Sequence, residues 1–352
     1  MTQPTAAIAM TSKREITIYD LARELNISTA TVSRALNNHP SVSKKTRKKI
    51  SELAKATGYQ QNNFASNLRK QKTHTIGVII HELNSRFIVS ALSGIEKVIT
   101  AAHYNIIIGH SAETSSKEAA NALNLFHKRV DGLIASLAYD TETLDHYEPF
   151  LKKDIPVVFF DRVKKDSAGI KIVIDNFKAG YEATTHLIQQ GCKRLVHITG
   201  NLMQNVYADR WKGFQSALAD NNLPCLPEQL IVNDLDEKAG IEAALQVLSM
   251  PERPDGIFVT NDLCAAVCMQ KLKEGGLKIP EDIAIVGFNN DLISRIAEPA
   301  LTTINYAGIE MGEVAAKCLI NQLNHNKLPD SNYTITLPAA LLIRASSLKK
   351  KL

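Results

Sequence analysis

The spacing of apolar residues changes near position 73, and this change divides the chain into two parts. Between Thr17 and Gly58, apolar residues recur every three or four positions in three short stretches. This spacing predicts three helices, because it places the apolar side chains on one face. The first covers Ile18–Leu25, the second covers Thr29–Leu36, and the third runs from a cap at Ser43 to Gly58.

Beyond Thr73, continuous apolar runs alternate with helical stretches such as Phe87–Ala102 and Asp262–Glu274. Such runs are typical of parallel strands that helices cover on both faces. Ten strands are more than one sheet usually holds, so they predict two doubly wound lobes. Folds of this kind bind ligands beyond the carboxyl ends of their strands. The predicted strands are Thr75–Ile80, Asn105–Ile108, Gly132–Ser136, Pro156–Phe160, Lys171–Ile174, Arg194–Thr199, Gln229–Val232, Gly256–Thr260, Ile283–Phe288 and Leu301–Ile304.

The predicted fold class is therefore an N-terminal all-α domain followed by an α/β body of two parallel-sheet lobes. Two short helices joined by a tight turn form a helix-turn-helix, and the second of them turns small polar residues outward. Short donors and acceptors suit a helix that bonds base edges in a groove, whereas a generic three-helix bundle is the alternative. The outward residues are Ser28, Thr29, Thr31, Ser33, Arg34 and Asn37.

The charge is unevenly distributed along the chain. Residues 1–72 carry 13 basic and four acidic residues, a net charge of +9, whereas the other 280 residues carry a net charge of −4. A basic module on a nearly neutral body indicates a polyanionic partner for the module, although a solvated basic helix face is the alternative. On the third helix, a basic face is placed to meet phosphates, through Lys44, Lys45, Arg47, Lys48 and Lys49.

Composition excludes several classes of protein. The chain has 352 residues, of which 45% are hydrophobic and 22% are charged, as in ordinary globular proteins. No apolar run reaches the ~18–20 residues that span a bilayer, so we expect no membrane partner. Five scattered cysteines fit reduced thiols, and hence a cytoplasmic location. No nucleophile, phosphate-binding or metal motif is present, so we expect neither an enzyme nor a cofactor.

The helix-turn-helix segment resembles the LacI/GalR family of bacterial transcription regulators. The resemblance rests on Ile27 to Asn37, on Val42-Ser43 and Thr46-Arg47, and on Gly58-Tyr59. It implies a homodimer on double-stranded operator DNA, and a hinge helix whose Leu68 opens a minor-groove step. The DNA-binding residues expected on this basis are Thr17, Ser28, Thr29, Ala30, Thr31, Ser33, Arg34, Asn37, Ala65, Leu68 and Arg69.

The resemblance also implies a periplasmic-binding-protein-like body with three crossovers between its lobes. The expected domains are an N-terminal extension (1–16), the helix-turn-helix domain (17–60), the hinge helix and linker (61–73) and the body (74–346). Lobe one is expected over 74–174 and 307–334, and lobe two over 175–306 and 335–346.

Polar and aromatic residues at the predicted strand ends are candidates for binding a small-molecule effector. Paired acceptors, fork-shaped donors and an apolar face suit a sugar or a sugar acid. The candidates are Phe87, Asp161, Arg162, Asp175, Arg210, Asp262 and Asn289. The resemblance implies all of these except Asp175 and Asp262.

Several alternatives remain open from the sequence. An equal interpretation is that Asp262 caps a helix, that Asp175 is a turn residue and that Phe87 belongs to the core. The alternative for Arg210 is a structural pair with Trp211. For the function, the alternatives are a regulator that answers a non-sugar metabolite, a sugar-binding receptor of an uptake system, and an enzyme on a two-lobed body. Gln204 and Val206 occupy positions where purine-responsive members of the family carry Arg and Thr, which argues against a purine.

Overall fold

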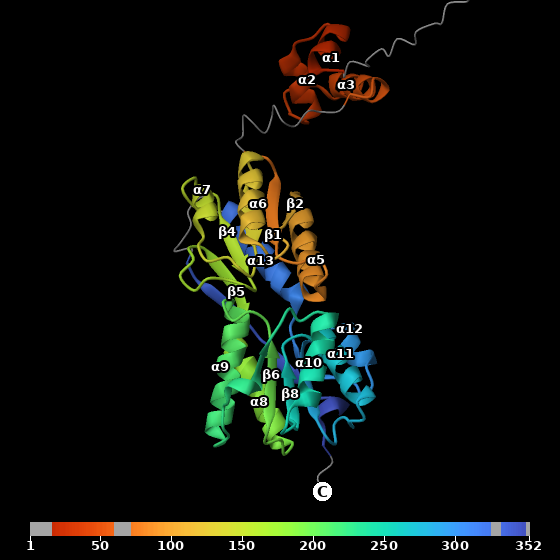
Figure 1. Cartoon of the computed structure of the whole chain (residues 1–352). Coiled ribbons are helices and arrows are strands. Elements are labelled where there is room, and N and C mark those ends of the chain that lie inside the picture. The colour runs from red at the N-terminus through yellow and green to blue at the C-terminus, as the bar shows by residue number, and fades with distance from the viewer. Residues whose placement is uncertain (1–15, 60–71, 325–331, 350–352) are drawn as a thin grey trace, which may run out of the picture. The chain divides into compact units, whose positions relative to one another are not determined.

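The computed structural model describes residues 16–59, 72–324 and 332–349, and the chain divides into two compact units at position 71 (Figure 1). The first unit contains three helices, α1 (Ile18–Glu24), α2 (Thr29–Leu36) and α3 (Lys44–Ala56). Their bounds agree with the predicted helices to within a few residues. The predicted fold class, a helical domain before an α/β body, is confirmed.

Local sequence explains where the helices of the first unit begin. The hydroxyl oxygen of Ser28 accepts a hydrogen bond from the backbone N–H of Thr31 at 3.1 Å, and Ser43 caps α3 through Thr46 in the same way. Both caps satisfy an N–H group that a helix start leaves unpaired. The apolar faces of the three helices then meet in one small core, formed by Leu21, Ala22, Val32, Ala35, Val42, Ile50 and Ala54.

The second unit contains two six-stranded sheets, each in its own lobe. In lobe one the strand order is β11-β5-β4-β3-β1-β2, and every pairing is parallel. Its strands are β1 (Thr75–Ile80), β2 (Asn105–His110), β3 (Gly132–Ala135), β4 (Val157–Phe160), β5 (Ile170–Ile174) and β11 (Thr334–Leu337). Its helices are α5 (Arg86–Ala101), α6 (Ser115–His127), α7 (Glu148–Leu151) and α13 (Gly308–Asn324).

Lobe two repeats this arrangement with the strand order β12-β10-β9-β8-β6-β7. All its pairings are parallel except that of β12, which runs antiparallel to β10. The strands are β6 (Leu195–Thr199), β7 (Leu230–Val232), β8 (Gly256–Val259), β9 (Ala284–Asn289), β10 (Thr302–Asn305) and β12 (Ala340–Leu342). The helices are α8 (Asn176–Gln189), α9 (Asn205–Asp220), α10 (Glu237–Ser249), α11 (Asp262–Glu274) and α12 (Leu292–Ile296).

The chain passes between the lobes three times. The first two crossovers follow β5 and β10, near the expected positions Asp175 and Tyr306. The third lies between β11 and β12, later than the expected 333–334, because residues 334–337 pair with β5 in lobe one. This segment alternates threonine with isoleucine and leucine, a pattern that suits an edge strand with one buried face.

Glycines allow close helix packing in both lobes. In lobe two, a Cβ atom on Gly213 of α9 would lie 2.2 Å from the backbone oxygen of Phe177 in α8. In lobe one, a Cβ atom on Gly94 of α5 would lie 2.1 Å from the backbone oxygen of Ile309 in α13. Neither contact is with a flexible side chain, so no larger residue fits without moving a helix.

We therefore expect Gly213→Ala to lower the free energy of unfolding by about 1–3 kcal/mol, the usual effect of overpacking. Replacing glycine by alanine inside a helix normally raises the free energy of unfolding, so the predicted change has the opposite sign. Urea unfolding measures the effect. Gln215→Ala, on the exposed face of the same helix, serves as the control and should change stability by less than about 0.5 kcal/mol. A Gly213→Ala protein as stable as wild type would contradict this account of the packing.

Candidate functional site

The surface of the first unit is built around α2. This helix buries Val32 and Ala35 and leaves its other faces to solvent. All the expected DNA-contacting side chains that the structure describes are exposed or half-buried, and none belongs to the core. They are Thr17, Ser28, Thr29, Ala30, Thr31, Ser33, Arg34 and Asn37.

Some of these polar side chains also stabilise the helices. The Thr17 hydroxyl donates to Asp20 at 2.6 Å, and the Asn37 amide donates to the backbone oxygen of Ser33 at 2.8 Å. Arg34, by contrast, is exposed, and its guanidinium group lies at the last turn of α2. The other three expected contacts, Ala65, Leu68 and Arg69, lie outside the described residues.

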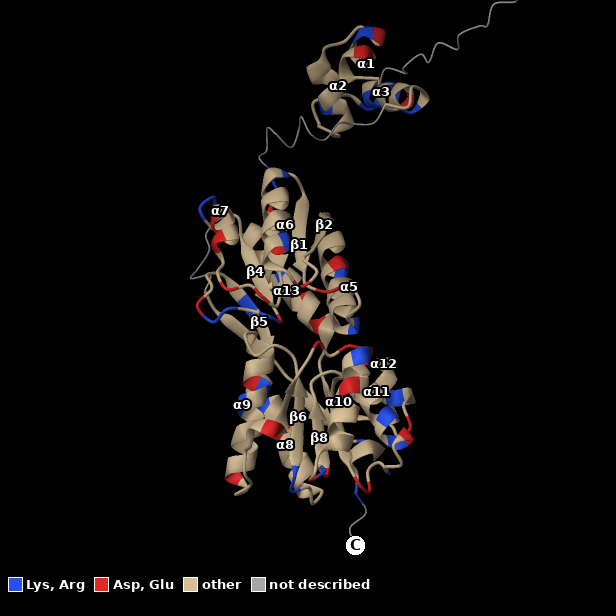
Figure 2. Ribbon diagram, in the orientation of Figure 1, with Lys and Arg blue, Asp and Glu red and all other residues tan. Residues whose placement is uncertain are grey.

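The basic face of α3 divides into two kinds of residue. Arg47 turns back and donates to the backbone oxygens of His39 at 3.1 Å and Val42 at 3.2 Å, so it holds the loop between α2 and α3. The lysines of the same helix are exposed, and basic positions make up much of α3 (Figure 2). Of the five basic residues expected to meet phosphates, the exposed ones are therefore lysines 44, 45, 48 and 49.

The second unit holds a cleft of about 470 Å³ at the carboxyl ends of its strands. Its size falls within the range of small-molecule sites. Lobe one contributes residues that follow β1 to β4, and lobe two contributes residues that follow β7 to β10 and residues from the start of α9. Five of the seven expected effector contacts line this cleft, namely Phe87, Asp161, Arg162, Arg210 and Asn289.

An aromatic and acidic group forms the floor of the cleft. The Tyr306 hydroxyl donates to Oδ1 of Asp161 at 2.5 Å, and the Tyr306 ring stacks on Phe87 with ring centroids 4.0 Å apart. Burial raises the pKa of Asp161 above its ordinary value, and the nearby Arg162 opposes this effect. Phe87 is thus both a buried residue and part of the cleft wall.

Two arginines flank this floor. The guanidinium of Arg162 lies 4.1 Å from the centroid of the Tyr139 ring and donates to Glu113 at 2.7 Å. The guanidinium of Arg210 lies 3.5 Å from the centroid of the Phe288 ring, and its Nε donates to Asn176 at 2.9 Å. Each cation therefore rests on an aromatic face, which is a favourable arrangement in a partly dry site.

The remaining two expected contacts lie outside the cleft lining. Asp175 is exposed and caps α8, accepting from the backbone N–H of Lys178 at 2.8 Å. Asp262 is buried, and its carboxyl group accepts from the Thr303 hydroxyl at 2.7 Å and from the backbone N–H of Asp291 at 2.8 Å. Both are held by structural hydrogen bonds, and the cap of α11 is the neighbouring Asn261.

Sequence reasoning missed several residues that line the cleft. All of them follow a strand or begin a helix, so strand-end reasoning applied to every strand points to them. From lobe one they are His81, Glu82, Asn84, Ser85, Glu113 and Tyr139, from lobe two they are Val206, Tyr207, Asp234, Leu235, Asp236, Thr260 and Leu263, and Tyr306 lies at the second crossover.

The lobes also contact one another directly through the start of α9. The Gln204 amide donates to the backbone oxygen of Ala138 at 2.8 Å, and the amide oxygen of Asn205 accepts from the backbone N–H of Val163 at 2.9 Å. The hydroxyls of Tyr139 and Tyr207 lie 3.2 Å apart. These contacts are hydrogen bonds between polar groups, and the side chains of Gln204 and Tyr207 are buried.

A helix-turn-helix unit attached to a two-lobed body with a ligand-sized cleft is the architecture of a DNA-binding regulator. Comparison with known families agrees: residues 17–62 match the bacterial regulatory proteins of the lacI family, and residues 184–347 match a periplasmic binding protein-like domain. Catabolite control protein A of Priestia megaterium is 33% identical over 94% of this chain and 99% of its own length. The chain belongs to the LacI family of DNA-binding transcription regulators.

Other comparisons are consistent with this assignment. The HTH-type transcriptional regulator RegA of Clostridium saccharobutylicum is 32% identical over 90% of this chain and 96% of that protein. The fold is similar to that of a lac repressor dimer bound to operator and the anti-inducer ONPF, with a TM-score of 0.84 and 23% identity over 95% of this chain and all of that chain. A complex of the regulator CelR with cellobiose has a TM-score of 0.71 and 22% identity, over 94% of this chain and all of that chain.

The relatives are regulators and repressors, and this chain is a regulator rather than an enzyme. Across the described ranges, no helix combines the length and the apolar character needed to cross a bilayer. Within the same residues, His, Cys, Asp and Glu side chains form no group of three or more that is placed to hold a metal.

Asp262 makes folding depend on pH. Burial raises its pKa from the ordinary value to about 7, so between about pH 4 and pH 7 the folded protein holds a proton that the unfolded chain has released. The free energy of unfolding should therefore fall as pH rises through this window, by up to about 1.4 kcal/mol per pH unit. In Asp262→Asn this contribution should disappear, as urea unfolding at several pH values will show.

The matched control is Asp154→Asn, because Asp154 is exposed. Its pH profile should run parallel to that of wild type. If the profile of Asp262→Asn also runs parallel to wild type, Asp262 does not titrate in the expected window.

Proposed function

We propose that this protein is a repressor whose affinity for operator DNA is controlled by a small effector bound in the cleft between its lobes. The cleft is the observation that supports this proposal. Residues of both lobes line it, and the same chain contains a helix-turn-helix unit. The effector we propose is a sugar or a sugar acid. Carboxylates, amides and guanidinium groups in the cleft suit hydroxyl groups, and Phe87 and Tyr306 supply an apolar surface.

On DNA, α2 is proposed to enter the major groove with Thr29, Ala30, Thr31 and Arg34 nearest the bases. These side chains lie on the outer surface of the helix, and small residues beside one arginine permit close approach to base edges. The exposed lysines of α3 are proposed to contact phosphates, a contribution that positions the protein without reading sequence.

The effector is proposed to act by changing how the two lobes are placed. Because it contacts both lobes, it stabilises the arrangement in which both sets of contacts form, and thereby shifts the population of lobe arrangements. Such a change would break and re-form the hydrogen bonds that Gln204, Asn205 and Tyr207 make between the lobes. By linkage, operator binding then changes effector affinity by the same factor.

The proposed assembly is a homodimer on a near-palindromic operator, in the cytoplasm, where its DNA partner is found. The lac repressor structure, whose fold this chain shares, is described as a dimer bound to operator. A twofold-symmetric protein places its two recognition helices about one turn of DNA apart. Titration of a duplex with two half-sites should accordingly reach saturation at two chains per duplex.

The DNA-binding part of the proposal predicts that Arg34→Ala weakens operator binding roughly 5- to 150-fold, the loss of about 1–3 kcal/mol for one arginine–base contact. Fluorescence anisotropy of the full chain on its own upstream DNA measures this effect across a salt series. Arg295→Ala removes an exposed arginine of α12 in the body and is the matched control. Equal affinities for the two variants would exclude Arg34 from base recognition, and a wild-type chain that binds neither this DNA nor random DNA at low salt would exclude operator binding altogether.

If the cleft binds the effector, Asn84→Ala should remove one uncharged hydrogen bond to it. The effector concentration needed to change operator binding should then rise about 2- to 10-fold. Asn84 lines the cleft and is exposed, so its replacement should leave stability and effector-free operator affinity unchanged. Asn124→Ala, in α6 of the same lobe, is the control. The effector is first found by adding pooled sugars, sugar acids and purines to the wild-type complex. If no pool shifts binding, the proposed effector control is wrong.

A further inference from the structure

The cleft contains one arginine that is well placed to bind an anion, but a carboxylate of the protein already occupies that position. Nη1 of Arg162 donates to Oε2 of Glu113 at 2.7 Å. The Arg162 side chain is 5% exposed and that of Glu113 is 21% exposed, so the pair lies largely out of water. An ion pair at this depth is difficult to break, because separation leaves an uncompensated charge behind.

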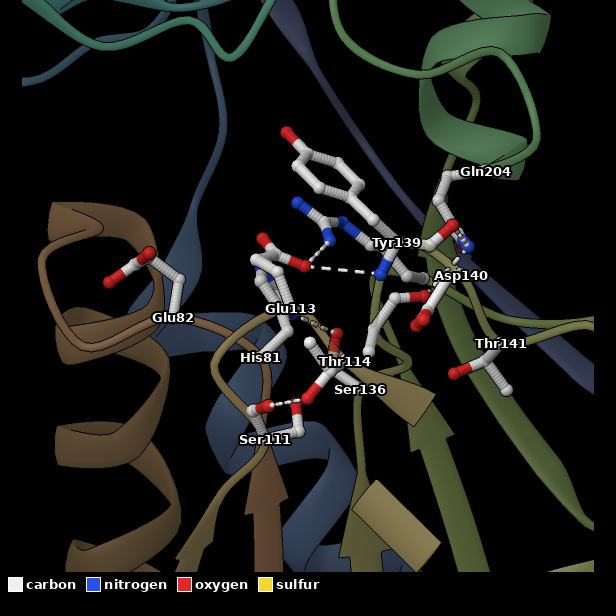
Figure 3. A network of polar contacts seen from close by, with 12 residues as sticks. His81, Glu82, Ser111, Glu113, Thr114, Ser136, Tyr139, Asp140, Thr141 and Gln204 are labelled. Atoms are coloured by element: carbon white, nitrogen blue, oxygen red, sulfur yellow. Dashed lines mark hydrogen bonds and ion pairs between the residues drawn. The ribbon is translucent and has the colours of Figure 1, made fainter. Parts of the chain in front are cut away.

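The backbone fixes Glu113 in this position. Ala112 and Glu113 follow β2 with φ angles of 47° and 60°, in the left-handed region that non-glycine residues seldom adopt. This turn directs the carboxylate toward lobe one's own strand ends, where Oε2 also accepts from the backbone N–H of Tyr139 at 3.1 Å. Figure 3 shows Glu113 beside Tyr139 in a polar network that also holds His81 and Ser136.

The rest of the cleft offers little that would bind an anion. Arg210 is the other lining cation, but its side chain is buried: Nε donates to Asn176, Nη1 donates to the backbone oxygen of Thr260 at 3.4 Å, and the guanidinium rests on the ring of Phe288. Burial lowers the pKa of His81 well below its ordinary value, so this ring is neutral at pH 7. Five carboxyl groups line the cleft against the two arginines, namely Glu82, Glu113, Asp161, Asp234 and Asp236.

Carboxylates of this kind are acceptors for hydroxyl groups. Glu82 lies in lobe one, and Asp234 and Asp236 lie in lobe two, so acceptors line the cleft on both sides. Each hydroxyl of a sugar is a donor that such a group can bind. A carboxylate or phosphate on the ligand, however, would enter a partly dry site where negative charge already predominates.

We propose that Glu113 fills the anion-binding position on Arg162, so that the cleft accepts an uncharged, hydroxyl-rich effector and rejects one that carries a carboxylate or phosphate. This inference rests on the proposed effector site and narrows its ligand to neutral sugars. Glu113 is thereby the specificity-determining residue for ligand charge. It acts by repelling an acidic ligand and by keeping Arg162 engaged, which is a common way to achieve specificity.

The test compares neutral sugars with acids of the same skeleton. Full-length wild-type protein is titrated by calorimetry with pools of neutral mono- and disaccharides, and then with the uronic, aldonic and phosphorylated forms of whichever sugar binds. We expect the acidic forms to bind at least about tenfold more weakly than the neutral parent, which corresponds to about 1.4 kcal/mol.

Glu113→Gln removes the charge and keeps an oxygen that can accept from Arg162 and Tyr139. The ratio of acid to neutral affinity should rise at least about tenfold in this variant. Asp234→Asn removes one negative charge from the cleft but leaves Arg162 paired, so it should raise the ratio by much less. Glu281→Gln is the control outside the cleft, since Glu281 is exposed and precedes β9 at the end opposite Asn289.

The outcomes are distinct. A wild-type protein that binds an acid as tightly as its neutral parent overturns the role of Glu113 but leaves the effector site intact. The same holds if Asp234→Asn and Glu113→Gln change the ratio equally, because the effect is then one of overall charge. If no sugar of any charge binds, the proposed effector function fails together with this inference. Should Glu113→Gln unfold, two results still overturn the role of Glu113: a wild-type protein that binds an acid as tightly as its neutral parent, or a tenfold rise of the ratio in Asp234→Asn.

Discussion

The hydrogen bond between Tyr306 and Asp161 is the interaction on which the geometry of the cleft depends. Asp161 ends β4 in lobe one, whereas Tyr306 follows β10 at the point where the chain leaves lobe two. The bond is 2.5 Å long and buried, so it joins the two lobes at their crossover without a competing water. Phe87 stacks on the same tyrosine ring, and the guanidinium of Arg210 lies 5.6 Å from its centroid. One residue thus sets the distance between the two walls.

The other contacts between the lobes include hydrogen bonds made by residues of α9 and the residue before it. Those made by Gln204 and Asn205 are hydrogen bonds to backbone groups of lobe one, and they lie at the start of a single helix, α9. A polar contact that water can replace contributes only about 0.5–1.5 kcal/mol. If two lobe arrangements lie close in free energy, a ligand that prefers one of them shifts the population effectively.

The sequence predicted what depends on periodicity and on short-range capping. The bounds of α2 at Thr29–Leu36 and its cap at Ser28 follow from the residues themselves, and so does the alternation of strands and helices in the body. Strand-end reasoning located the cleft but not the direction of each side chain. Asp175 follows a strand and yet faces outward to cap α8. Glu113 follows β2, so strand-end reasoning points to its position, but the direction of its carboxylate depends on a left-handed turn that no residue type in the segment announces.

The helix-turn-helix unit and the cleft differ in their charges, and this difference allows the coupling between DNA binding and effector binding to be measured. The N-terminal 72 residues carry a net charge of +9, and their lysines lie exposed on α3, so operator affinity should depend strongly on salt through counterion release. In the cleft, the Arg162–Glu113 pair is largely buried and screening reaches it much less, whereas Asp234 and Asp236 are exposed. Salt is therefore expected to weaken DNA binding more than it weakens the buried Arg162–Glu113 pair of the proposed effector site. A coupling factor that stays constant across a salt series would locate the allosteric change in the body rather than in the phosphate contacts.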